Sequence, residues 1–151
     1  MFVGILKNSG SGKRMIQTAL SSSSFIGFSR EEVLHTASLL GVDALEWTSD
    51  GFLDEGDLES AHDFMQATLH AGFSVSGYGS LFRTCQHDER QFERILSTAE
   101  ALGTSMVRIW APPETHQIAK EENRFIDTTR RLADLAAEQG ICVCYNLEDR
   151  K

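Results

Sequence analysis

A pattern of hydrophobic and polar residues recurs four times along the chain: an amphipathic helix, a glycine and then a short apolar strand. The glycines are Gly41, Gly72, Gly103 and Gly140, which are 31, 31 and 37 residues apart. Glycine adopts positive φ at low cost, so it is typical of the position just after a helix ends. The pattern therefore predicts four helices, each followed by a strand.

Capping residues indicate where three of these helices begin. Ser29 and Glu32 have the spacing of a capping box, Asp88 and Gln91 form a weaker version of it, and Asp57 is a candidate N-cap. One more strand is expected upstream of the first helix. The predicted strands cover residues 15–20, 42–47, 73–78, 104–110 and 141–148.

Strict alternation of helices and strands predicts an α/β fold with parallel strands. Two architectures fit: a five-stranded open sheet, which 151 residues complete, and a (β/α)₈ TIM barrel, which takes about 250 residues. A flavodoxin-type sheet lacks its glycine-rich phosphate loop here, although residues 21–24 could replace it. The strand ends favour a partial barrel of about five parallel strands and four helices over residues 15–151, after a flexible extension over residues 1–14.

Side chains suited to binding a polar ligand occupy the predicted strand ends, where the sites of parallel α/β proteins lie. For several of them a structural role stays open beside ligand binding. The tryptophans could instead pack over the end of the core, and the arginine could instead form an ion pair with one of the glutamates. Glycines beside the tyrosine favour ligand contact there. The candidate site residues are Glu46, Trp47, Tyr78, Arg108, Trp110 and Glu148.

The composition changes this picture little. A formal charge of −8 argues against a nucleic-acid partner, and no apolar run approaches the ~20 residues that cross a membrane. Three cysteines, with no C-x-x-C pair, suggest a reducing cytoplasm. Cys142 and Cys144 alternate on one face of a predicted strand, where core packing is favoured over metal or redox use.

The strand-end segments resemble those of a known family. Residues 45–47, 78–80 and 99–103, the last leading into 107–111, together with Leu147 and Glu148, are similar in order and spacing to the sugar phosphate isomerase/epimerase superfamily. This is the xylose isomerase-like TIM-barrel group, also called the AP endonuclease 2 family. It contains epimerases, isomerases, dehydratases and endonuclease IV. The resemblance covers the N-terminal part of such a barrel, from about Met15 to Glu148.

The resemblance implies a divalent metal, Mn²⁺, Mg²⁺ or Zn²⁺, that polarises a sugar while a carboxylate moves a proton beside a carbonyl through an enediolate. Glu148 matches a glutamate that is a metal ligand, and often also an acid/base, in the family. Glu46, Trp47, Arg108 and Trp110 match pocket positions. Relatives often carry His where this chain has Arg150. One carboxylate cannot hold a catalytic metal, so we expect an incomplete metal site in this chain alone.

The leading hypothesis is a truncated or partial metal-dependent sugar or sugar-phosphate isomerase/epimerase acting on a small sugar or polyol. One alternative is an inosose dehydratase-like lyase. The other is a non-catalytic half-barrel that associates with itself or with a partner chain, because an unclosed parallel sheet leaves strand edges available.

Overall fold

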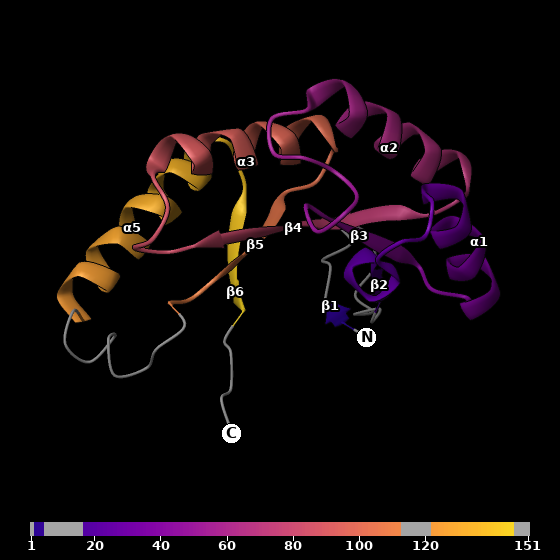
Figure 1. The fold of residues 1–151 in the computed structure, drawn as a ribbon, viewed down its shortest axis with the longest axis horizontal. Helices are drawn as coiled ribbons and strands as arrows, with labels where there is room; N and C mark the ends of the chain where they lie inside the picture. Colours follow the sequence, from indigo (N-terminus) through magenta and orange to yellow (C-terminus); the bar gives the residue numbers. More distant parts are fainter. Residues whose placement is uncertain (1, 5–16, 113–121, 147–151) are drawn as a thin grey trace, which may run out of the picture.

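In a computed structural model, which describes residues 2–4, 17–112 and 122–146, one curved sheet carries all of its helices on a single face (Figure 1). The six strands lie in chain order, and every neighbouring pair from β2 to β6 is parallel. The strands are β1 (Phe2–Gly4), β2 (Gln17–Ser21), β3 (Ala44–Thr48), β4 (Ser74–Arg83), β5 (Met106–Trp110) and β6 (Cys142–Asn146).

The five parallel strands and four helices form a half-barrel, as the sequence predicts. Between consecutive parallel strands the chain passes through one long helix, and the helices form an arc over the sheet (Figure 1). They are α1 (Arg30–Leu40), α2 (Leu58–His70), α3 (Glu89–Ala101) and α5 (Glu122–Glu138), with a short 3₁₀ helix, η1, at Ser22–Phe25.

Local signals set the helix ends. Ser29 and Glu32 form both hydrogen bonds of a capping box, and the Asp57 and Asp88 side chains accept backbone N–H groups at the starts of α2 and α3. Gly41 ends α1 in the left-handed region, at φ 65°. The other three repeat glycines also have positive φ. Each predicted cap and each predicted glycine turn is therefore confirmed.

Two strands differ from the prediction. β4 continues to Arg83, five residues beyond the predicted end at Tyr78. Phe2–Gly4, inside the predicted N-terminal extension, pairs antiparallel with β2. Residues 5–16 of that extension lie outside the described part of the chain.

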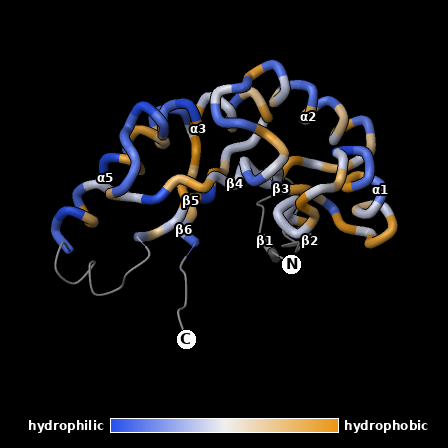
Figure 2. Tube along the Cα trace, in the orientation of Figure 1, coloured by the Kyte–Doolittle hydropathy of each residue, from blue (hydrophilic) through white to orange (hydrophobic). Residues whose placement is uncertain are grey.

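The hydrophobic core lies between the sheet and the helices. The helices alternate between hydrophilic and hydrophobic residues along their length (Figure 2), and the residues that contact the sheet are buried. In β5, Val107 and Ile109 are fully buried, whereas Met106, Arg108 and Trp110, which alternate with them, are half-buried. Strands with this alternation have two different faces, which we call the helix face and the inner face.

Candidate functional site

The inner face carries an ion pair that joins two strands across a third. Arg108 on β5 donates from Nε to Glu46 Oε1 at 2.8 Å and from Nη2 to Glu46 Oε2 at 3.0 Å. Both side chains are largely buried, with exposed fractions of 14% and 11%. A paired and hydrogen-bonded arrangement of this kind is what makes buried charges tolerable. The sequence alternative in which Arg108 pairs with Glu46 is therefore confirmed.

Glycines in β4 make this pair possible, because β4 lies between the two strands that carry it. Gly79 is the register partner of Arg108. A Cβ atom added at Gly79 would lie 2.6 Å from Arg108 Nη2 and 2.9 Å from Thr48 Cγ2, which is closer than atoms can approach. Glycine at this position therefore leaves room for the guanidinium to cross β4 and reach β3.

Ser21 is a third member of the cluster and is not among the site residues predicted from the sequence. Its hydroxyl donates to Glu46 Oε2 at 2.5 Å and lies 3.0 Å from the Ser23 hydroxyl. The signal that could have identified it is the register, since Ser21 aligns with Glu46 at the end of β2. We call Ser21, Glu46 and Arg108 the inner-face cluster.

One nitrogen of the cluster remains available to a ligand. Within the described residues, Arg108 Nη1 makes no hydrogen bond, while Nε and Nη2 are both held by Glu46. The glutamate thus fixes the plane of the guanidinium, and both of its oxygens accept hydrogen bonds. A fixed guanidinium with a free edge is suited to binding an oxygen atom of a polar ligand.

Trp110 lies on the same face as Arg108, two residues further along β5. Its indole is half-buried, and the Arg83 guanidinium lies 5.2 Å from the ring centroid. The structure therefore brings Glu46, Arg108 and Trp110 to one face of the sheet.

The structure places Trp47 and Tyr78 on the opposite, helix face, away from the inner-face cluster. Both are fully buried. Trp47 donates from Nε1 to Thr68 Oγ1 on α2 at 2.9 Å, and Tyr78 donates to the Leu53 carbonyl at 2.7 Å. Burial raises the pKa of Tyr78, and the nearby carboxylates of Glu55 and Asp54 raise it further. Side chains buried and hydrogen-bonded in this way present no surface to a sugar.

Glu148 lies outside the described residues, so its predicted roles as ligand and base stay predictions. Among the residues that the structure describes, no group of three or more His, Cys, Asp or Glu side chains could hold a metal ion. Glu46, the carboxylate of the inner-face cluster, already accepts hydrogen bonds from Arg108 and Ser21. The described residues therefore do not by themselves fit a divalent metal.

The two thiols of β6 correct another expectation. Cys142 is exposed and Cys144 is half-buried, and their register partners are Met106 and Arg108. They therefore lie on the inner face rather than in the core between the sheet and the helices. The reason is that alternation along the strand directs Val143 and Tyr145, not the cysteines, toward the helices.

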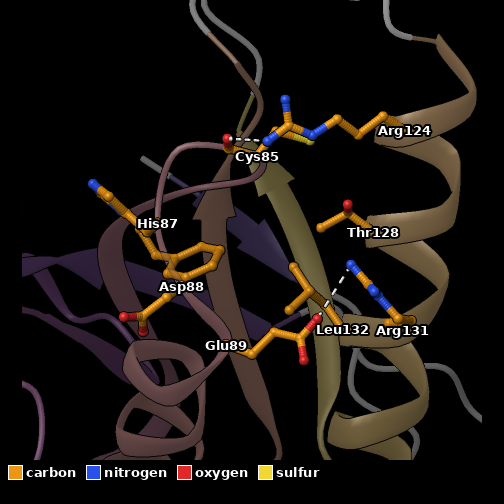
Figure 3. Close-up of a pocket in the computed structure, with 9 residues that line it drawn as sticks. Cys85, His87, Asp88, Glu89, Arg124, Thr128, Arg131 and Leu132 are labelled. Atoms are coloured by element: carbon orange, nitrogen blue, oxygen red, sulfur yellow. Dashed lines mark hydrogen bonds and ion pairs between the residues drawn. The ribbon is translucent and has the colours of Figure 1, made fainter.

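A separate pocket of about 290 Å³ lies between the turn after β4 and helix α5 (Figure 3). Charges of both signs line it: Arg131 pairs with Glu89 at 3.2 Å, and Arg124 donates to the Cys85 carbonyl at 3.4 Å. Cys85 has a φ of 68°, unusual for a residue other than glycine. The pocket is lined by helix-face residues such as Phe82 and Leu132, so it is distinct from the inner-face cluster.

Solved structures with this arrangement of strands and helices identify the fold. A probable 3-DHS dehydratase, AsbF, involved in petrobactin synthesis in Bacillus anthracis, matches with a TM-score of 0.65 and 15% identity over 84% of this chain and 50% of its own. The chain has the fold of half a barrel of the kind found in solved xylose isomerase domain proteins. A xylose isomerase domain-containing protein from Salmonella typhimurium LT2 gives a TM-score of 0.64 at 16% identity, over 84% of this chain and 47% of its own.

A xylose isomerase domain protein from Planctomyces limnophilus gives a TM-score of 0.60 at 16% identity, over 87% of this chain and 52% of its own. The chain thus spans about half the length of these three solved structures. No family model and no curated protein matches the sequence. In the described part of the chain, no helix is both long and apolar enough to span a bilayer.

Proposed function

We propose that this chain forms part of a sugar or sugar-phosphate isomerase/epimerase, in which the inner-face cluster binds a polar substrate. The observation that carries the proposal is the Arg108–Glu46 pair, a largely buried guanidinium with one free nitrogen on the inner face. Arg108 Nη1 would donate to a hydroxyl, carbonyl or phosphate oxygen of the substrate, and Glu46 would keep the guanidinium in place.

The hydrophobic part of the site would come from Trp110. Its half-buried indole is on the same face as Arg108. Sugars have C–H faces that pack on aromatic rings, while their hydroxyls need hydrogen-bond partners. A fixed donor and an aromatic surface on one face are therefore a suitable combination for a sugar or a polyol. The three cysteines are free thiols, which supports a protein that acts in a reducing compartment such as the cytoplasm.

In the same proposal, Glu148 is the base. Its carboxylate would take a proton from the carbon beside a carbonyl. When bound, a divalent metal (Mn²⁺, Mg²⁺ or Zn²⁺) would stabilise the negative charge that develops on the carbonyl oxygen of the substrate. Glu148 would be one of its ligands, together with ligands that the described residues do not provide.

The test is deuterium uptake from D₂O into a panel of ketoses, supplied with Mn²⁺ and followed by NMR. We expect uptake at the carbon next to the carbonyl with the natural sequence, and a loss of at least about 100-fold with Glu148→Gln, within the range that general acid–base catalysis contributes. Glu138→Gln, at an exposed position at the end of α5, is the matched control. Equal uptake by the natural sequence and Glu148→Gln refutes the role of Glu148.

A dehydratase-like lyase is a second candidate, favoured by the similarity to the probable 3-DHS dehydratase. Loss of water beside a carbonyl begins with removal of the same kind of proton, so the inner-face cluster would act in the same way. The two reactions differ in their products. Formation of a conjugated carbonyl, followed by its ultraviolet absorbance, supports the lyase, and formation of an epimer or an aldose supports the isomerase.

Association with a second copy or with a partner chain is a third candidate, favoured by the difference between a central and an edge strand. All five residues of β3 are buried, whereas no residue of β6 is. β6 is also the last strand of the described sheet. Strands with free edges pair readily with other chains. Sedimentation over a range of concentrations tests this candidate, and a monomer at every concentration contradicts self-association.

A further inference from the structure

Three sulfur atoms occur at neighbouring positions on the inner face, next to the proposed sugar site but not part of it. Cys142 and Cys144 alternate along β6, and Met106 on β5 is the register partner of Cys142. Cys142 is exposed, and the other two side chains are half-buried. The three residues share one face of two adjacent strands, so their side chains extend to the same side of the sheet.

The two thiols are close enough to affect each other. Burial raises the pKa of the Cys144 thiol, the neighbouring Cys142 thiol and the Glu46 carboxylate raise it further, and the Arg108 guanidinium lowers it. Cys144 also has Arg108 as its register partner. Thiols so placed share one small region of the inner face, and a ligand that replaces their protons would bind both at once.

Strand geometry separates two possible uses of this pair. Residues i and i+2 of a strand lie about 6.6 Å apart, and their Cβ atoms point the same way. A disulfide needs Cβ atoms about 3.5–4.5 Å apart, so it would require movement of the strand. An ion bound between the two sulfurs requires less movement than a disulfide does. With metal–sulfur bonds of about 2.3 Å, the two sulfurs lie about 4 Å apart. Rotation of the two side chains about χ1 can bring them to this separation.

The ligand atoms then determine the class of ion. Hard cations such as Mg²⁺ prefer oxygen, and a structural zinc site needs four ligands, whereas thiolate and thioether sulfur favour soft ions such as Cu(I). Met106 can supply a thioether. Its Sδ would lie 3.8 Å from a Cβ added at Gly77, so it now folds over β4, and its flexible side chain allows the sulfur to turn toward β6.

We propose that Cys142, Cys144 and Met106 form a binding site for a single soft monovalent cation, Cu(I), on the inner face of the sheet. The two thiolates are the principal ligands and Met106 Sδ is the third. Binding requires both thiols to lose their protons, so the affinity rises with pH over the range in which the thiols are still protonated. This site does not depend on the proposed isomerase function.

The experiment is an anaerobic titration of the reduced full chain with Cu(I), in competition with a chromophoric Cu(I) chelator. We expect one equivalent to bind tightly. Cys142→Ser and Cys144→Ser should each weaken binding by more than the roughly 10–100-fold typical of losing an outer-shell partner, because each removes a ligand. Met106→Leu keeps the side-chain volume and should cost less, about tenfold, or ~1.4 kcal/mol.

Cys85→Ser is the matched control, because Cys85 is also a free, half-buried thiol but lies in the turn after β4. Its substitution should leave the titration unchanged. A second measurement uses the natural sequence alone: Cu(I) should protect Cys142 and Cys144 from alkylation, as mapped by mass spectrometry, while Cys85 still reacts. Equal protection of all three thiols, binding unaffected by both β6 serines, or stronger competition by Zn²⁺ than by Cu(I) overturns the proposal.

Discussion

The two faces of the central sheet differ in chemistry although they are built from the same strands. On the helix face, Trp47 and Tyr78 are fully buried, and each polar atom of these side chains has a partner within the protein. On the inner face, Glu46 and Arg108 hold each other across β4, and Arg108 keeps one nitrogen free of any described residue. The comparison teaches that Trp47 and Tyr78 stabilise this fold from the helix face, while residues of the opposite face, such as Glu46 beside Trp47, carry the charged groups.

The largest effect is expected on the helix face. Trp47→Ala should lower the free energy of unfolding by about 4 kcal/mol, because it empties a fully buried site and removes the hydrogen bond to Thr68. Chemical denaturation measures this. Trp47→Phe is the control that keeps most of the packing, and it should cost less than half as much. If Trp47→Ala is as stable as the natural sequence but loses ligand binding, the assignment of this face to folding is wrong.

On the inner face, the expected effect depends on whether one or both charges are removed. Glu46→Ala leaves Arg108 largely buried without its partner, which should cost about 3 kcal/mol of unfolding free energy. Replacing both residues, Glu46→Met with Arg108→Leu, should restore stability to within about 1 kcal/mol, since well-packed apolar residues can replace a buried pair. A double variant as unstable as Glu46→Ala would show that the pair is needed for folding.

The glycines of β4 test how the pair is positioned. Gly79→Ala should cost about 2 kcal/mol and displace the guanidinium, because the new methyl group would lie 2.6 Å from Arg108 Nη2. Gly77→Ala is the matched control on the same strand, where the nearest atom would be the Met106 carbonyl oxygen at 3.5 Å. Denaturation and ligand titration of both variants check this. Equal effects of the two substitutions contradict the crossing of Arg108 over Gly79.

The smallest expected effect is at Tyr78. Tyr78→Phe removes one buried hydrogen bond and should cost about 1 kcal/mol near neutral pH. The pKa of Tyr78 is raised in the folded protein, so its contribution is complete below about pH 10, where unfolded tyrosine starts to ionise, and is lost as the pH rises further. Unfolding measured from pH 8 to 11 should show a steeper decline for the natural sequence than for Tyr78→Phe. Parallel curves contradict the role of burial.

Much of the fold follows from the sequence because its signals are local. The capping box at Ser29 and the four turn glycines each depend on a few neighbouring residues, and they place the helices correctly. The length of β4 was not predictable, because Leu81 and Phe82 follow a glycine-rich segment that interrupts the apolar pattern. The end of β4 that hydrophobicity alone predicts, Tyr78, therefore lies five residues before the observed end at Arg83.

The site was only half predictable for a similar reason. Residue type and strand position single out Glu46, Arg108 and Trp110, which share the inner face, and their roles with a substrate stay predictions. Adjacent residues such as Glu46 and Trp47 point to opposite faces, a difference that residue type alone does not show. The contributions of Ser21 and Gly79 depend on the residues that align with them on neighbouring strands, Glu46 and Arg108. A local sequence pattern does not contain this information. Separating the two faces by period-two alternation would have removed Trp47 and Tyr78 from the candidate pocket.

The central claim is that the ion pair of Glu46 and Arg108 serves substrate binding rather than folding. Deuterium uptake by the Glu46→Met, Arg108→Leu double variant tests this claim most directly. We predict that this variant folds, within about 1 kcal/mol of the natural stability, and has lost uptake from D₂O at the carbon beside a ketose carbonyl. Uptake at the natural rate in the folded double variant, or no uptake by the natural sequence on any ketose tested, would contradict it.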